Sequence, residues 1–279
     1  MAEESELEEI RAGLRALLAW EEELSGDSLG GAVLPAPSMT PLAAPAPLPR
    51  EDAPSAPAPR PRQEAPAAPA PAPREEAPTL AAPGAASPVP AAPVSLEVLA
   101  TEAASCTRCR LHEGRTKSVF ARGSAATDLA FVGEGPGYHE DQQGLPFVGR
   151  AGQLLDRMVV AMGYTREGVY VCNVVKCRPP DNRAPKPDEA GACARYLEGQ
   201  LDVVAPKAIV ALGRTAAVGL GVCGPETRGW RGTWGVWRGI PVMPTYHPAF
   251  LLRSPQHKRA VWEDLQAVLR RLGRPVPGR

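Results

Sequence analysis

Cysteine is the residue type in this chain whose spacing most clearly points to chemistry, because thiolates are ligands for zinc and for iron–sulfur clusters. A C-x-x-C pair in SCTRCRL is followed by single cysteines in VVKCRPP and GACARYL, which gives Cys106, Cys109, Cys177 and Cys193. Zinc and a 4Fe–4S cluster both take four cysteine ligands, so the spacing leaves both open, beside burial of one or two thiols as small apolar groups. We expect Cys172, in an apolar stretch, and Cys223, in a glycine-rich turn, to be structural.

A glycine-rich segment, FVGEGPGYHEDQQGLPFVGRAG over residues 131–152, carries two carboxylates close to its glycines, Glu134 and Glu140. It follows an apolar run and precedes a helical pattern that begins near Ala151. The glycines at 133, 135 and 137 resemble a dinucleotide-binding fingerprint only superficially, because in that fingerprint the helix begins within the glycine run. An ordinary strand-to-helix loop is the alternative to a binding loop.

A second loop, PTYHPAFLLR over residues 244–253, places His247 after another apolar run, with Pro248 fixing the backbone beside it. Leu251 and Leu252, next to Arg253, have the chemistry of an apolar wedge that enters a duplex beside a cation that binds phosphate. The alternatives are a structural histidine and, for the two leucines, the start of a buried helix.

The elements that must position these loops alternate between strands and helices. Apolar, β-rich runs occupy 128–133, 169–175, 207–213 and 240–247, and helical patterns occupy 151–163, 187–204, 215–221 and 257–272. Ser95 has the residue type of an N-cap for an earlier helix. The alternation predicts an α/β fold, a three-layer sandwich with a central, mostly parallel four-stranded sheet. Sites in such folds form at the carboxyl ends of strands, where both loops lie.

The N-terminal part of the chain differs in composition from the rest. Residues 1–94 carry 14 acidic and 6 basic side chains, and residues 95–279 carry 17 acidic and 25 basic ones, which gives net charges of −8 and +8. Residues 1–29 predict an acidic amphipathic helix, either solvent-exposed or docked on a protein partner. Residues 30–94 hold 19 of the 33 prolines and predict a disordered Pro/Ala-rich linker. Residues 95–279 predict one domain, whose basic charge favours nucleic acid as a partner.

The location of the protein follows from what the sequence lacks. No apolar run of roughly 18 residues is present, which argues against a transmembrane helix. The acidic start MAEESELEEI argues against a secretory signal. We therefore expect a cytoplasmic protein with reduced thiols and no membrane association, and we expect a monomer.

Taken together, the motifs resemble family 4 uracil-DNA glycosylases, the iron–sulfur branch of that superfamily. The matching segments are spread over nearly the whole of residues 95–272: SCTRC (105–109), GEGPG (133–137), ED with the later PFVGRAGQLLD (140–156), VCNVVKCRPPDNRAPKPDE (171–189), IVALG (209–213) and HPAFLLR (247–253). The resemblance implies a 4Fe–4S cluster held by the cysteines at 106, 109, 177 and 193. A related branch has a histidine after the KCRPP-like segment that bonds to the abasic product; residues 176–189 contain no histidine, which argues against covalent trapping.

The resemblance also implies roles for the residues that would bind the base. The enzyme would flip uracil out of DNA, stack it on Phe147 and pair its edge with Asn173. His247 would donate a hydrogen bond to O2 of the departing uracil. Gly135, in the uracil-binding loop, stands where another branch has an aspartate that acts as the base.

The remaining carboxylates of the loop, Glu134 and Glu140, are then the candidates for positioning the attacking water, and Glu140 could instead exclude the methyl group of thymine. Hydrolysis of the N-glycosidic bond would leave an abasic site for base excision repair. The alternative is a non-catalytic iron–sulfur DNA-binding module of a repair or replication complex. The sequence leaves open the preference for single- or double-stranded DNA and the activity on other deaminated bases.

Overall fold

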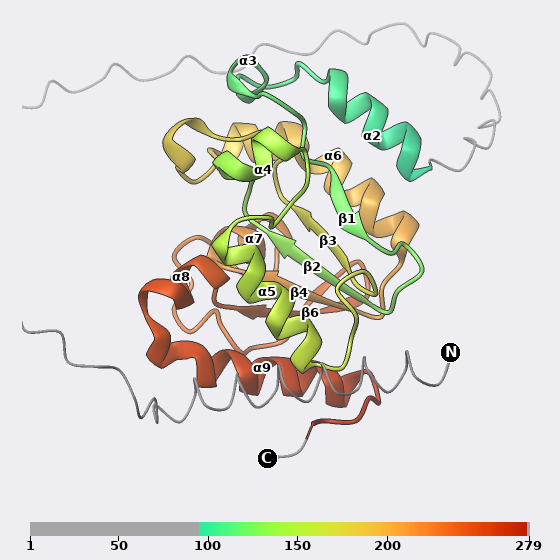
Figure 1. Ribbon diagram of the computed structural model, residues 1–279, viewed down its shortest axis with the longest axis vertical. Helices are drawn as coiled ribbons and strands as arrows, with labels where there is room; N and C mark the ends of the chain where they lie inside the picture. Colours follow the sequence, from blue (N-terminus) through green and yellow to red (C-terminus); the bar gives the residue numbers. More distant parts are fainter. Residues whose placement is uncertain (1–94, 278–279) are drawn as a thin grey trace, which may run out of the picture. The chain divides into compact units, whose positions relative to one another are not determined.

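The computed structural model describes residues 95–277, which form one mixed six-stranded sheet with the order β1-β3-β2-β4-β6-β5 (Figure 1). The strands are β1 (Ala121–Gly123), β2 (Leu129–Gly133), β3 (Tyr170–Asn173), β4 (Ala208–Leu212), β5 (Gly235–Trp237) and β6 (Ile240–Thr245). The four central strands are parallel and are the four that the sequence predicts, and β1 and β5 pair antiparallel at the edges.

The predicted strand number was therefore too low. The two edge strands have three residues each, and each contains a glycine, so neither gives an apolar or alternating run in the sequence. The central strands β2, β3 and β4 are buried along their whole length, which is why they appear as continuous apolar segments.

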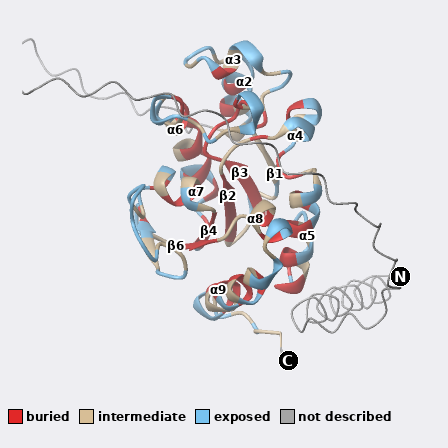
Figure 2. Ribbon diagram, turned by 90° about the vertical axis from the view of Figure 1, so that its left-hand side faces the viewer, coloured by how far each residue is buried: buried red, intermediate tan, exposed pale blue. Residues whose placement is uncertain are grey.

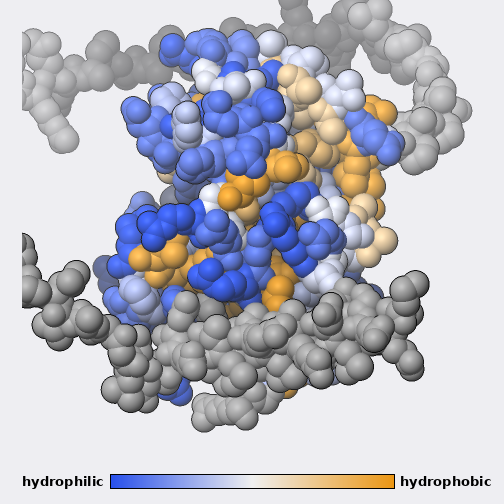
Figure 3. Space-filling view, viewed as in Figure 1, coloured by the Kyte–Doolittle hydropathy of each residue, from blue (hydrophilic) through white to orange (hydrophobic). Residues whose placement is uncertain are grey.

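Helices cover both faces of the sheet, as a three-layer sandwich requires. One face packs against α2 (Leu96–Ser105), α6 (Pro187–Val204) and α7 (Arg214–Gly219), and the other against α5 (Arg150–Ala161), α8 (Pro248–Arg253) and α9 (Lys258–Arg271). Along β2, Phe131 packs on the face that α5, α8 and α9 cover, whereas its neighbours Ala130 and Val132 pack on the face that α2, α6 and α7 cover. Figure 2 shows buried strands between helices whose outer faces are exposed, and the face in Figure 3 is mostly hydrophilic with smaller apolar areas.

The helices predicted within residues 95–277 are confirmed, with ends that differ by a few residues. Ser95 caps α2, since its Oγ accepts a hydrogen bond from the backbone N–H of Val98 at 3.3 Å. Helix α8 occupies the end of the segment 244–253 that was predicted to be a loop, as in the alternative of a helix at the two leucines. Four other short elements were not predicted because none is long enough to show a helical period: α3 (Leu111–Gly114), α4 (Tyr138–Gln143) and the 3-10 turns η1 (Pro180–Asn182) and η2 (Pro255–His257).

The predicted acidic helix at residues 1–29 and the predicted linker at residues 30–94 lie outside the described residues. Within residues 95–277, none of the helices combines the length and the apolar character needed to cross a membrane.

Candidate active site

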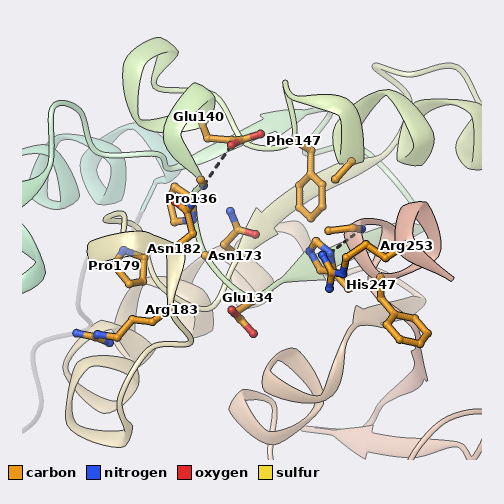
Figure 4. Close-up of a pocket in the computed structure, with 15 residues that line it drawn as sticks. Glu134, Pro136, Glu140, Phe147, Asn173, Pro179, Asn182, Arg183, His247 and Arg253 are labelled. Carbon is orange, nitrogen blue, oxygen red and sulfur yellow. Dashed lines mark hydrogen bonds between the residues drawn. The ribbon is translucent and has the colours of Figure 1, made fainter. Parts of the chain in front are cut away.

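An open pocket of about 430 Å³ lies at the carboxyl ends of β2, β3 and β6 (Figure 4). The carboxyl ends of parallel strands share one edge of the sheet, so loops far apart in the sequence meet there. The residues predicted for the site that line this pocket are Glu134, Gly135, Glu140, Phe147, Asn173, His247 and Arg253. The turn after β3, which the site prediction did not include, adds Pro179, Asn182 and Arg183.

Phe147 is held in the pocket by its backbone as well as by packing. Its φ of 56° lies in the left-handed region, and its side chain is 5% exposed. A Cβ atom on Gly133 would lie 2.5 Å from Phe147 Cζ, so glycine at this position leaves the space that the ring occupies. The ring and the His247 imidazole are inclined by 26°, with centroids 5.6 Å apart. The pocket therefore contains a fixed aromatic face beside a polar ring.

Asn173 is the last residue of β3 and lies in register with Gly133 of β2. Its side chain is 2% exposed, and Oδ1 accepts no hydrogen bond from the described residues. A buried polar atom without a partner costs about 1–3 kcal/mol, so native proteins pair nearly all such atoms. Asn173 also lines the pocket, so its oxygen is a candidate acceptor for an N–H group of a ligand.

His247 is the N-cap of α8, and its Nδ1 accepts a hydrogen bond from the backbone N–H of Ala249 at 3.1 Å. An accepting Nδ1 leaves the imidazole hydrogen on Nε2. Burial lowers the pKa of His247 to about 4; the Arg253 guanidinium acts in the same direction, and the Glu140 carboxylate opposes it. The imidazole is therefore a neutral hydrogen-bond donor near pH 7.

Both carboxylate oxygens of Glu140 are engaged by backbone N–H groups. Oε2 accepts from Gly137 at 3.1 Å, and Oε1 accepts from Val148 and Gly149 at 3.0 Å each. These bonds tie the start of α4 to the segment that carries Phe147 and to the start of α5. Glu140, predicted as a catalytic carboxylate, thus stabilises the pocket wall through hydrogen bonds to its backbone.

Glu134 follows the end of β2 and lines the pocket. Its Oε2 accepts a hydrogen bond from Thr215 Oγ1 of α7, and Oε1 has no hydrogen-bond partner among residues 95–277. A Cβ on Gly135, the next residue, would lie 2.8 Å from Val175 Cγ2, so the loop passes close to the segment after β3. Sequence reasoning missed Thr215, because a threonine within a helical pattern carries no sign of a role in a pocket. Of the two carboxylates, only Glu134 has an oxygen without a hydrogen-bond partner among residues 95–277.

Comparison with known proteins identifies the family. Residues 120–266 match the family model described as the uracil DNA glycosylase superfamily. The chain belongs to this superfamily. Curated relatives named type-4 uracil-DNA glycosylase are similar over most of their length. The relative from Thermotoga maritima is 45% identical over 181 residues, which cover 61% of this chain and 91% of the relative. The relative from Sulfurisphaera tokodaii is 42% identical over 183 residues, which cover 62% of this chain and 83% of the relative. The relative from Archaeoglobus fulgidus is 38% identical over 195 residues, which cover 66% of this chain and 96% of the relative. Within the superfamily, the chain belongs with the type-4 proteins.

Leu251 and Leu252, predicted as an apolar wedge, both lie in helix α8 but differ in exposure. Leu251 is fully buried in the core that α5, α8 and α9 share, so the prediction that its side chain contacts DNA was wrong and the alternative of a buried helix applies to it. Leu252 is 38% exposed, and Arg253 is exposed and lines the pocket. Successive residues of a helix point roughly 100° apart, so Leu252 can face solvent while Leu251 faces the core.

The cysteines predicted as ligands from the type-4 resemblance line one small pocket, separate from the first: Cys106, Cys109, Cys177 and Cys193. They come from the segment after α2, from the loop after β3 and from α6. Cys172, which is fully buried in β3, and the half-buried Cys223 do not line it, as expected for structural residues. Within residues 95–277, no three Cys, His, Asp or Glu side chains are arranged to hold a single metal ion.

Hydrogen-bond donors point at sulfurs of the cysteine pocket. Cys177 Sγ accepts from Arg115 Nη1 at 3.2 Å, and Cys193 Sγ accepts from the backbone N–H of Lys176 at 3.3 Å. Burial raises the pKa of the Cys109 and Cys177 thiols and raises that of Cys193 to about 11. Thiolates at these positions therefore need a bound cationic group to stabilise them.

Proposed function

We propose that the chain is a monofunctional uracil-DNA glycosylase, which hydrolyses the N-glycosidic bond of deoxyuridine in DNA and leaves an abasic site. The observation that carries this proposal is the buried, unpaired Oδ1 of Asn173 in a pocket that also holds a neutral histidine donor. The names of the type-4 relatives support the same activity. The alternative of a non-catalytic DNA-binding module is not favoured, because it gives no reason for these groups to converge.

Uracil recognition in this proposal uses two side chains, Phe147 and Asn173. The base is extruded from the DNA, because its glycosidic bond cannot be reached inside a duplex. It stacks on Phe147, and Asn173 accepts from N3–H through Oδ1 and donates to O4 through Nδ2. Cytosine has an acceptor at N3 and a donor at C4, so it would leave both Asn173 groups mismatched. A site that is built to pair specific polar groups discriminates strongly, because the wrong ligand leaves buried groups unpaired.

Bond cleavage in this proposal depends on charge that develops on the base. Negative charge accumulates on uracil as the bond to the sugar breaks, and the Nε2–H of His247 donates to O2 there. Because the imidazole is neutral, it donates without having to transfer its proton. Water, oriented by the unpaired Oε1 of Glu134, then attacks C1′ of the sugar, and the proton that it releases neutralises the uracil anion. Thr215 holds the other oxygen of Glu134 and so fixes the direction of the carboxylate.

We propose that Leu252 and Arg253 contact the DNA beside the extruded nucleotide. Both are exposed at the end of α8, and Arg253 lies at the rim of the pocket. Leu252 has the size to fill part of the space that the base leaves, and the Arg253 guanidinium can bind a flanking phosphate.

We further propose that the four pocket cysteines hold a 4Fe–4S cluster. The four cysteines line a common pocket, and the resemblance of the chain to the iron–sulfur branch of the superfamily favours a 4Fe–4S cluster over zinc at this site. When bound, the cluster supplies cross-links between chain segments rather than a group for hydrolysis. We also propose that the protein acts in the cytoplasm as a monomer, where its thiols stay reduced.

The test is incubation of the purified chain with uracil-containing and matched thymine-containing oligonucleotides, followed by alkaline cleavage of abasic sites. Cleavage of the uracil strand alone is expected. Asn173→Ala should reduce the single-turnover rate about a hundredfold, since it removes specific contacts to the base, while DNA binding persists. A chain that leaves the uracil strand intact, or an Asn173→Ala variant with a near-normal rate, would overturn the proposal.

A further inference from the structure

Lys176 is a cation that the fold encloses. It lies in the loop after β3, and its side chain, 1% exposed, is among the largest that are fully buried. Its Nζ donates a hydrogen bond to the backbone carbonyl oxygen of Asn173 at 2.5 Å. Among residues 95–277, no carboxylate forms an ion pair with this ammonium.

Such a position is unfavourable unless another group compensates it. An ammonium loses several kcal/mol of hydration free energy when it is buried. One carbonyl oxygen satisfies only one of its three N–H groups. Lys176 therefore needs a nearby anion as well as the carbonyl of Asn173.

The groups next to Lys176 that can carry negative charge are cysteine sulfurs. Lys176 lines the cysteine pocket, its backbone N–H donates to Cys193 Sγ, and Cys177 is its neighbour in the chain. An iron–sulfur core bound by four thiolates has a net negative charge, and this charge would compensate the ammonium.

We propose that Lys176 is a positioning residue that links the cysteine-bound cluster to the uracil-binding Asn173. Its ammonium balances the charge of the cluster, and its hydrogen bond to the Asn173 carbonyl holds the end of β3 at the pocket. The proposal rests on the proposed function for the identity of the ligand. It gives the cluster a local effect on base recognition in addition to its cross-linking of the chain.

Arg115 provides a matched comparison within the same chain. Its guanidinium also donates to a ligand sulfur, that of Cys177, but its other hydrogen bonds go to the backbone oxygens of Cys106 and Ala104. Arg115 therefore contacts the segments that carry Cys106 and Cys177 without a hydrogen bond to Asn173. Lys207 is an exposed lysine at the start of β4, and it serves as a control for loss of charge alone.

The experiment uses the full chain with Lys176→Met, Arg115→Met and Lys207→Met. Three quantities are measured: the rate of iron loss to a chelator, the midpoint potential of the cluster, and inhibition by free uracil in preparations matched for iron content. Lys176→Met and Arg115→Met should both release iron about tenfold faster, since groups that support metal ligands affect metal affinity by this factor or more. Both should also shift the midpoint to more negative potential, because a cation near the cluster favours its reduced form.

Only Lys176→Met should weaken inhibition by uracil, by about tenfold, which corresponds to the loss of one well-placed hydrogen bond in the support of Asn173. Lys207→Met should change none of the three quantities. If Lys176→Met does not fold, Lys176→Gln keeps a donor for the Asn173 carbonyl without the charge. It should retain uracil inhibition and still shift the midpoint.

Unchanged iron release and midpoint in Lys176→Met would show that the ammonium does not balance the cluster. Equal weakening of uracil inhibition in Lys176→Met and Arg115→Met would show that no specific link through Lys176 exists. Uracil excision by the unmodified chain is measured in parallel. Its absence would overturn the proposed function, and the iron release and midpoint would still report on Lys176.

Discussion

At the scale of single residues, the protonation state of His247 follows from its place at the start of α8. The backbone N–H of Ala249 occupies Nδ1, and a proton there would face another donor. Burial lowers the pKa of His247 to about 4. The residue is therefore suited to stabilise an anionic leaving group by hydrogen bonding rather than to act as a proton shuttle near pH 7.

His247→Ala should lower the single-turnover rate at saturating enzyme by roughly a hundred- to a thousandfold, the usual effect of removing a donor that acts in the transition state. DNA affinity should change little. In the unmodified chain, the contribution of His247 should be constant from about pH 8 down to about pH 5, because its pKa lies lower. A saturating rate that survives the substitution, with only binding or the melting temperature reduced, would assign His247 to loop structure instead.

The lowered pKa of His247 also makes the free energy of unfolding depend on pH. The folded protein holds His247 neutral, whereas the unfolded chain protonates it below about pH 6.5. The free energy of unfolding should therefore have its full His247 contribution above that pH and lose it as the pH falls toward 4. His247→Ala should lack this part of the pH dependence in denaturant titrations.

The substitution Glu140→Gln distinguishes a structural role of this carboxylate in the pocket wall from a catalytic role. Glu140→Gln places an amide N–H₂ against a backbone N–H of Gly137, Val148 or Gly149, so the free energy of unfolding should fall by about 1–3 kcal/mol. Thermal melting and single-turnover kinetics are the measurements. A large loss of rate at saturating enzyme with an unchanged melting temperature would return Glu140 to a catalytic role.

Sequence motifs located most of the pocket but not the direction of every side chain. Phe147, Asn173 and His247 could be placed because their segments follow strands whose carboxyl ends meet in a parallel sheet. Which of two adjacent leucines is buried depends on how α8 is rotated about its axis, which the motif does not give. The contact of Thr215 with Glu134 depends on the packing of α7 against β2, which likewise has no local sequence signal.

At the scale of elements, the predictable part of the fold is the part with uniform burial. Strands β2, β3 and β4 are buried along their whole length and β6 over its last four residues, because helices cover both faces, so their sequences stand out. The edge strands β1 and β5 and the helix α4 are short, and they exist through tertiary pairing rather than through local preference. The cysteine pocket likewise depends on α2, α6 and the loop after β3 meeting in space.

The substitution Cys177→Ala tests whether the cysteine-bound cluster links the loop after β3 to α6 and to the segment after α2. With three cysteines left, we expect loss of most of the iron and of the visible colour, together with a lower melting temperature, because the loop after β3 is no longer tied to α6 and to the segment after α2. Iron analysis, absorption and thermal melting are the measurements. Cys223→Ala is the matched control, since this half-buried cysteine lies outside the pocket and should keep full iron. Full iron in Cys177→Ala would mean that the proposed ligand set is wrong.

At the scale of the whole molecule, charge is divided between the two parts of the chain. Residues 95–279 have a net charge of +8 and residues 1–94 one of −8. The basic part includes the pocket and the exposed Arg253, so it carries the attraction for the phosphate backbone. An acidic segment of equal charge competes with DNA only weakly at physiological salt, because charges separated by more than about 8 Å are screened.

Removal of residues 1–94 should therefore leave uracil excision on naked oligonucleotides within a few-fold of that of the full chain. The pocket, its supporting hydrogen bonds and the cysteine pocket all belong to residues 95–277. At low salt the truncated protein should bind DNA more tightly, since a charge of −8 has been removed, and the difference should shrink as salt is added. Single-turnover rates and DNA affinities at several salt concentrations measure both effects. A large loss of the saturating rate at every salt concentration would contradict the expectation, because it would mean that the N-terminal residues contribute directly to the active site.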